Sequence, residues 1–476
     1  MQEPETAESK TPPENHAMRR YSRFHARVMS FALLVGMTSA GRADIVVPGA
    51  DGSDGRLTCG TFLTPPNPTY PCDIDTCSLT TPLTWTIDLS QAVPRAWDTP
   101  SPQPGRGVYD HEKWAVVFKY ECVNIPPNVT IRFVNHPSRA PVVWLVSGNV
   151  NIRGTVIVDA GAAPSTPGSF TEPGPGGFRG GARGNSAESL PSAGLGPGGG
   201  SRTGFGNNGG WAAGSYATRG ASGGGVLQSP EYGNSRIVPL IGGSGGAPWS
   251  DGAGGGGGGS ILIASSKAIV LNKSPAVSAN ASNSASDVGG SGGAIRLIAD
   301  QVLGFAGGEV LQARGGGSRS GTGRIRIESK VLQFAGVTNP AFSSEAPAPT
   351  AVLWPDVTAP FVQIKTIGAQ VAPTDPRASL DIPGADVIVP NQGSQLVVLE
   401  AKNVPLDWAV AIRMVPRQGP DVTAQAAYIS GNEALSTWHA TLPLPPGFAV
   451  LQARAYEQSA AAFGEDDEEA SSSVQE

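Results

Sequence analysis

A unit made of a glycine turn and an apolar strand repeats through the middle of the chain. It occurs at 258–271, 292–305 and 321–336, at offsets of 34 and 30 residues, and an earlier pair, 120–135 and 147–161, aligns at an offset of 27. A unit of this size cannot bury its apolar face alone, so the copies must stack on one another. The sequence therefore predicts an all-β fold built on a parallel β-helix, a solenoid.

Alternation along these strands predicts which side chains point into the solenoid. Leu262, Arg296 and Arg326 are expected to face outward into solvent. The glycines at 254–259 precede the first of these strands, and we expect them to form a corner, because glycine adopts positive φ without a steric penalty. The expected inward residues are Ile261, Ile263, Ile295, Leu297, Ile325 and Ile327.

Glycine and proline are frequent, with 64 Gly and 42 Pro among 476 residues, and the strand pattern nearly disappears over 160–253. A composition of this kind commonly indicates disorder, but here apolar strands flank it. We interpret 160–253 as a glycine-rich loop that leaves one corner of the solenoid and packs as polyproline-II-like segments. Disorder and a linker between domains are the alternatives. The aromatic residues expected to hold it against one face are Phe178, Phe205, Trp211, Tyr216 and Trp249.

The N-terminal region has the layout of a secretory signal. Arginines that follow Met18 precede a short apolar run at 28–38, and small residues come next. The run is too short to span a bilayer. We predict a signal peptide at 18–43, a dispensable or mis-called leader at 1–17, and no integral membrane segment after signal removal. The expected location is secreted, extracellular or periplasmic, with association to the cell surface.

The cysteines all lie early in the chain, at Cys59, Cys72, Cys77 and Cys122. In an oxidising compartment we expect two disulfides among them, with three possible connectivities. The region 44–110 is predicted to form a cysteine-containing cap on the solenoid, which then occupies 111–342.

The C-terminal part is predicted to hold a second domain. A Pro-rich linker at 343–360 is followed by short alternating strands over 361–460, which indicate an immunoglobulin-like β-sandwich. We expect this sandwich to shield the last solenoid coil. The tail at 461–476 is acidic and is expected to be disordered. With a net charge of −6 and no basic patch, the chain is not expected to bind nucleic acid.

Several strand sequences resemble a known group of proteins. NIPPNVTIRF, PVVWLVSGNVNIRGTVIVDAG, GGSGGAIRLIAD and GRIRIES are similar to segments of exported, glycine-rich, largely uncharacterised bacterial proteins with a pectin-lyase-like right-handed parallel β-helix. The likeness covers about 110–335. It implies the fold only, because that superfamily contains polysaccharide lyases, glycosidases, adhesins and passive surface proteins.

Charged residues on the predicted outer strands are the candidates for catalysis. A lyase of this class needs clustered carboxylates for calcium and a basic residue, and a glycosidase needs paired acids across the scissile bond. The coils offer the acids Asp159, Asp300 and Glu328 with the bases Arg296, Arg324 and Arg326. The candidate catalytic set among them is Asp300, Glu328, Arg296 and Arg326. The Asp-Asp pair and the Gly-His-Gly of the glycosidases are missing, so a solvated polar face is the preferred interpretation.

Two short acidic stretches contain the residue types of a metal or acid–base site. GADGSDG has the Asp and Gly composition of a calcium loop, with Asp51 and Asp54 as its candidate ligands. It lacks the spacing and the distal Glu of an EF-hand, and this absence favours a plain turn. YDHEKW at 109–114 groups an Asp, a His and a Glu, and we expect a loop there. No cofactor is expected, with calcium as the alternative.

These patterns predict a secreted or surface-associated β-solenoid with a structural or adhesive role, whose partners are extracellular polysaccharide or other surface proteins. Enzymatic activity is uncertain, and the absence of a dense catalytic cluster argues against it. The alternative is a polysaccharide lyase or glycoside hydrolase with a site assembled across adjacent coils.

Overall fold

The computed structural model describes residues 44–457, apart from 64–66, 68–70, 73–78, 167, 185–190, 205–208, 249–251, 285–287, 305–306, 381–383 and 391–392. All of the described residues belong to one compact unit, which begins at Asp44. The predicted leader, signal peptide and acidic tail lie outside the described residues. Within the described part, no helix has the length and apolar character needed to cross a membrane.

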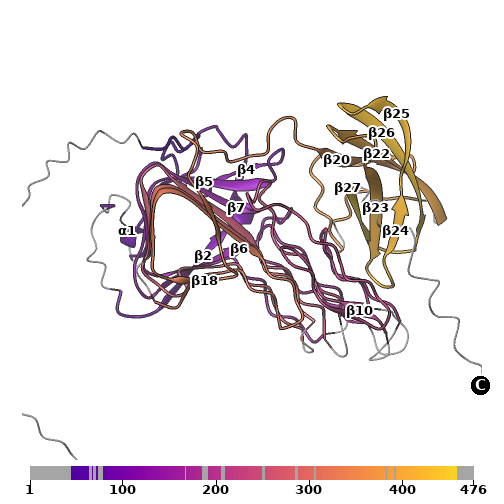
Figure 1. Ribbon diagram of the computed structural model, residues 1–476, viewed down its shortest axis with the longest axis horizontal. Helices are drawn as coiled ribbons and strands as arrows, with labels where there is room; N and C mark the ends of the chain where they lie inside the picture. The colour runs from indigo at the N-terminus through magenta and orange to yellow at the C-terminus, as the bar shows by residue number, and fades with distance from the viewer. Residues whose placement is uncertain are drawn as a thin grey trace, which may run out of the picture. The chain divides into compact units, whose positions relative to one another are not determined.

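The main body is all-β, and its strands pair almost entirely in parallel. Each circuit of the chain passes three strand positions, and successive circuits stack at each position around a three-sided interior (Figure 1). The first two positions belong to one sheet, the large sheet, and the third belongs to another, the small sheet. This confirms the all-β class and the parallel stacking that the repeats predict.

At each position the strands stack in a fixed order. The first position holds the start of β5 (Ala115–Ile125), β7 (Val142–Val146), β12 (Ser260–Ser265), the starts of β15 (Ala294–Gly304) and β17 (Arg324–Phe334), and β19 (Ser343–Glu345). The second holds β1 (Gly55–Leu57), the end of β5, β8 (Val150–Ile152), β13 (Ala268–Leu271) and the ends of β15 and β17. The small sheet is β2 (Leu83–Asp88), β6 (Val129–Val134), β9 (Thr155–Ile157), β14 (Val277–Ser278), β16 (Glu309–Gln312) and β18 (Val337–Asn339).

The strand registers confirm two of the predicted offsets and correct the third. Ile295 lies opposite both Ile261 and Ile325, as the offsets of 34 and 30 require. At the offset of 27, Ile125 does lie opposite Ile152. One strand later, however, Ile131 faces Val156, two residues earlier than the offset predicts. The second circuit turns its corner with two fewer residues, so the repeat is not constant around the circuit.

The interior prediction is confirmed. The six residues predicted to point inward belong to one buried apolar cluster, to which the remaining circuits also contribute. Phe118 and Trp144 are members of this cluster and are fully buried. Since the period-two alternation places these side chains on one face of each strand, stacking produces a continuous apolar column.

The prediction that the outward face is solvated is wrong for the large sheet. Leu262 points away from the interior, yet it is only 1% exposed, because a second apolar layer covers it. Segments 44–50, 216–241 and 351–354 supply that layer. Its buried members include Ile45, Val47, Tyr216, Ile237 and Leu353.

The segment predicted as a linker, 343–360, is part of the body. Its β19 extends the large sheet beyond β17. The next residues pair with the start of the described chain, since Val46 N donates to Pro349 O at 2.8 Å and Ala351 N donates to Val46 O at 2.8 Å. A proline-rich composition does not prevent a segment from lying at a sheet edge, where fewer N–H donors are needed.

The six glycines at 254–259 do not form the predicted corner. None of them has positive φ, and each is bonded into a bundle of extended segments by backbone hydrogen bonds such as Gly257 N to Phe178 O at 2.9 Å. Every third glycine faces the same neighbour, where a Cβ would collide with backbone atoms. Gly254 and Gly257 face 243–246, Gly255 and Gly258 face 279–282, and Gly256 and Gly259 face 172–175.

A period of three is that of a polyproline-II helix, which agrees with the prediction for the glycine-rich region. All three faces of 254–259 are packed, so each position excludes a side chain. The described parts of 160–253 are therefore ordered by the same close backbone contacts. Of the aromatic residues expected to hold this region, Tyr216 is fully buried and Phe178 packs in an apolar cluster, whereas Phe205 and Trp249 lie outside the described residues.

The C-terminal strands form two antiparallel sheets that share one apolar core. Val397 and Leu399 of one sheet pack with Val410 and Ile412 of the other. One sheet is β21 (Gln370–Val371), β20 (Phe361–Ile367), β22 (Gly393–Lys402), β26 (Leu435–Leu444) and β25 (Ala427–Asn432). The other is β24 (Val422–Gln425), β23 (Ala409–Pro416) and β27 (Ala449–Tyr456).

The sandwich is anchored on the glycine-rich region. Leu195 packs with Leu380, Val415 and other sandwich residues, and Arg413 donates from Nη1 to Gly194 O at 3.1 Å. These anchoring contacts involve neither β17 nor β18. The sandwich is therefore held at the glycine-rich region, and these contacts do not provide the expected shielding of the last circuit.

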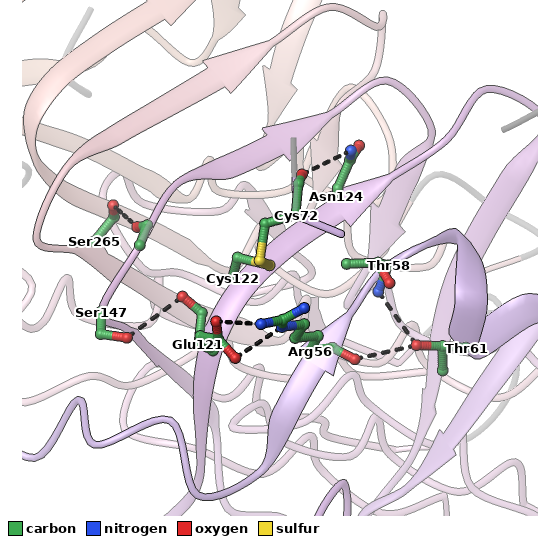
Figure 2. Close-up of a disulfide and its surroundings, with 10 residues drawn as sticks. Arg56, Thr58, Thr61, Cys72, Glu121, Cys122, Asn124, Ser147 and Ser265 are labelled. Carbon is green, nitrogen blue, oxygen red and sulfur yellow. Dashed lines mark hydrogen bonds and ion pairs between the residues drawn. A yellow bond between two sulfur atoms is a disulfide. The ribbon is translucent and has the colours of Figure 1, made fainter. Parts of the chain in front are cut away.

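The N-terminal region caps the first circuit through a disulfide between Cys72 and Cys122 (Figure 2). Beside it, Arg56 makes a two-point ion pair with Glu121, with both N–O distances at 2.7 Å. Cys59 is also disulfide-bonded, and Cys77 lies outside the described residues. Around this cap lie α1 (Cys59–Phe62), the 3-10 helix η1 (Leu89–Gln91), β3 (Val93–Pro94) and β4 (Val108–Asp110), while β10 (Trp211–Ala212) pairs with β11 (Ser222–Gly223) in the glycine-rich region.

Candidate functional site

The residues singled out for catalysis do meet in space, on the outward face of the large sheet. Arg296 lies opposite Arg326 in the β15–β17 register, and Ile298 lies opposite Glu328. Asp300 lies two residues after Ile298 on β15, so it belongs to the same outward face. Adjacent parallel strands thus bring Arg296, Arg326 and Glu328 into contact, as the sequence predicts, whereas Asp300 pairs with Lys330.

These four side chains are buried, contrary to expectation. The exposed fractions are 2% for Arg296, 6% for Arg326, 8% for Glu328 and 6% for Asp300. The same second layer that covers Leu262 covers them. A substrate chain has no open face here on which to bind.

Ion pairs satisfy most of this charge. Arg296 reaches Glu328 Oε1 through Nη2 at 2.8 Å and through Nε at 2.9 Å. Arg326 bridges Glu328, at 3.4 Å from Nε, and Glu345. Lys330 Nζ lies 2.8 Å from Asp300 Oδ1. Burial lowers the pKa of Arg296, and the Glu328 carboxylate opposes that effect.

The Asp51–Asp54 stretch is a structural turn. Asp54 Oδ1 accepts the N–H groups of Gly105 at 3.0 Å and Gly107 at 3.1 Å, and its Oδ2 accepts that of Lys119 at 2.8 Å. Burial raises the pKa of Asp54, and these hydrogen bonds act against it. Across the described residues, no group of three or more His, Cys, Asp or Glu side chains is placed to hold a metal ion.

We expect Asp54→Asn to destabilise the chain by about 2 kcal/mol, because the amide nitrogen would face a buried N–H donor. Asp51→Asn is the matched control, since Asp51 accepts the exposed turn N–H of Ser53 at 2.8 Å. Chemical denaturation with calcium and with a chelator measures both variants. A calcium-dependent gain in the parent that either variant loses would restore the metal interpretation.

YDHEKW forms the turn of an antiparallel hairpin between β4 and β5, so the predicted loop is present. Asp110 Oδ1 accepts the N–H groups of Glu112 at 2.9 Å and Lys113 at 3.1 Å, which closes the turn. The Asp110 carboxylate is therefore used in backbone hydrogen bonding.

One cluster near this hairpin was not predicted. Tyr109 donates its hydroxyl to Asp375 Oδ1 at 2.6 Å and stacks on His136, with ring centroids 3.9 Å apart. Burial, together with the bond to Asp375, raises the pKa of Tyr109, and burial lowers the pKa of His136. Residues 266 positions apart give no sequence signal of their contact.

A set of polar side chains lies on the outward side of the small sheet and just beyond the ends of its strands, and of these the sequence singled out only Asp159. We call it the polar strip, and none of its members is buried. Asn280 donates from Nδ2 to Gln312 Oε1 at 3.1 Å and accepts the N–H of Arg314 at 2.9 Å, which links successive circuits. The strip comprises Thr86, Arg132, Asp159, Asn280, Gln312 and Asn339. Asp159 and Asn280 lie two residues beyond β9 and β14, because the register partners of Gln312 on those strands are Ile157 and the buried Ser278.

Asp159 gives the strip a perturbed carboxyl group. Burial raises its pKa, while hydrogen bonds from Asn280 and Ser278 and the charge of Arg132 act in the opposite direction. The N–H of Asn280 donates to its Oδ1 at 2.6 Å. A carboxyl group that is partly exposed, perturbed and close to an arginine is suited to ligand binding.

Nothing outside the chain itself assigns this face a role. No protein-family model, no curated protein and no solved structure matches the chain.

Proposed function

We propose that the protein is an exported, non-enzymatic scaffold that binds extended polysaccharide along the polar strip. In this proposal the circuits form a right-handed parallel β-helix and the C-terminal domain is an immunoglobulin-like sandwich. The observation that carries the proposal is the contrast between the two sheets. The large sheet has a buried outward face, whereas the small sheet presents polar side chains to solvent.

The geometry of the strip supports an extended ligand over a compact one. Strands in a sheet lie about 4.8 Å apart, so the polar side chains of neighbouring circuits offer donors and acceptors in a closely spaced series. A polysaccharide presents hydroxyl groups along its length in the same way. The apolar interior beneath holds these side chains in place, which favours binding by pre-organised contacts.

The test is binding of the purified chain to a panel of neutral and acidic polysaccharides. Replacing Arg132 and Gln312 together with Ala should weaken saturable binding at least tenfold, about 1.4 kcal/mol, because the two lost polar contacts lie in the strip. Lys365→Ala is the control, since Lys365 is half-exposed on the sandwich. Absence of saturable binding to every polysaccharide would refute the proposal.

A lyase or hydrolase function is the second candidate, and the perturbed, partly exposed Asp159 favours it. The same panel should then release unsaturated products or new reducing ends, and Asp159→Asn should abolish the release without preventing binding. Release that survives Asp159→Asn would remove this residue from the chemistry.

A further inference from the structure

Four arginines lie close together where a loop of the glycine-rich region meets the large sheet. Arg296, Arg324 and Arg326 project from neighbouring positions of β15 and β17 on the outward face. Arg236 lies on the loop above, and that loop is tied to the sheet because Ser343 Oγ donates to Ser235 O at 3.2 Å. Ser343 is the register partner of Arg326, so this hydrogen bond places Ser235, the neighbour of Arg236, beside Arg326 on the same face.

The same loop region fixes the outermost of these arginines. Arg324 donates from Nη2 to Tyr232 O at 3.0 Å, and its guanidinium lies 5.3 Å from the ring centroid of Tyr216. Tyr216 is completely buried and packs against Tyr232. The cluster therefore has a rigid, largely apolar wall on its loop side.

The positive charge of the cluster exceeds the negative charge that contacts it. Glu328 pairs with Arg296 and Arg326, and Glu345 pairs with Arg326, so four guanidinium groups meet two carboxylates. Arg296 Nη1 and Arg324 Nε are both buried and make no hydrogen bond within the described residues. Arg296 is only 2% exposed, so its unpartnered donor is costly unless a ligand satisfies it.

We propose that this cluster, Arg236 with Arg296, Arg324 and Arg326, is a binding site for an oxyanion, either the carboxylate of an acidic sugar or a sulfate group. A guanidinium presents a planar fork of donors that matches the oxygens of both groups, and several guanidiniums together favour a divalent or multiply bonded anion. The edge of the cluster reaches solvent at Arg236, which is exposed, and at Glu345, whose side chain is 55% exposed. The site lies on the large sheet and does not depend on the polar strip.

The proposal is tested on the purified full-length chain by calorimetric titration with sodium sulfate and with sodium galacturonate, each against sodium chloride at matched ionic strength. Saturable binding of either anion, weakened at least tenfold by Arg236→Gln and by Arg296→Gln, is the expected result. The tighter of the two anions identifies the natural group as carboxylate or sulfate.

Two comparisons keep the result interpretable. Arg236 is exposed on a loop, so Arg236→Gln should fold even if Arg296→Gln does not. Arg314→Gln removes an arginine that lies just beyond β16 and pairs with Glu309, and this variant should bind as the parent does. If neither anion binds, or if Arg236→Gln binds as tightly as Arg314→Gln, the unpartnered donors face only water and the proposal is wrong.

Discussion

Gly257→Ala is expected to destabilise the protein by about 3 kcal/mol or more, at or beyond the upper end of ordinary overpacking. The added Cβ would collide with the backbone of Gly243, which is not a side chain that can move aside. Relief would require separating two segments of the glycine bundle, and with it the hydrogen bond from Gly257 N to Phe178 O. Equilibrium denaturation of parent and variant measures the loss.

Gly307→Ala is the matched control for this substitution. Gly307 does not have positive φ, and a Cβ there would meet nothing within 4 Å. The same change should be neutral or stabilise by up to about 1 kcal/mol, through the lower entropy of the unfolded chain. Equal losses at both positions would mean that the bundle is not packed as described.

Glu328→Ala is expected to cost about 3 to 5 kcal/mol, the range for removing one partner of a buried ion pair. Arg296 and Arg326 would then keep their charges inside the second layer without the carboxylate that both contact. Thermal and chemical denaturation would show this loss.

The control here is Glu309→Ala, which breaks the more exposed pair with Arg314. That pair should contribute no more than about 1 kcal/mol, because solvent screens it and holding both side chains costs entropy. A loss below 1 kcal/mol for Glu328→Ala would contradict the burial of the cluster and reopen the case for a catalytic face.

Local pattern was sufficient for the interior of the body. The alternation at Ile295 and Leu297 gives both the strand and its inward face, because period two links side-chain direction directly to sequence. The predicted register is wrong at β9, where Val156 lies opposite Ile131 because the preceding corner is two residues shorter. Corner length depends on close contacts such as that of Gly154 with Val129, which no strand pattern encodes.

The outward face and the candidate sites could not be predicted in this way. Whether Arg296 meets solvent depends on segments 44–50 and 351–354, which are distant in sequence and cover the sheet only after folding. The prediction of a corner at 254–259 was wrong for a related reason. Glycine is used both where the backbone needs positive φ and where two backbones approach closely. Only the identity of the neighbours distinguishes the two uses. Tyr109 and Asp375, and likewise Arg236 and Arg296, meet through tertiary contacts alone.

The pairing of Val46 with Thr350 sets an order on assembly. Contacts this distant form late, because the closure entropy of a long loop must first be overcome. A chain that emerges from a ribosome or a translocation pore N-terminus first must therefore keep Ile45 and Val47 unpaired until Ala351 follows. Throughout that interval the second apolar layer of the large sheet is incomplete, so the nascent chain is most open to aggregation or to chaperone binding at this sheet.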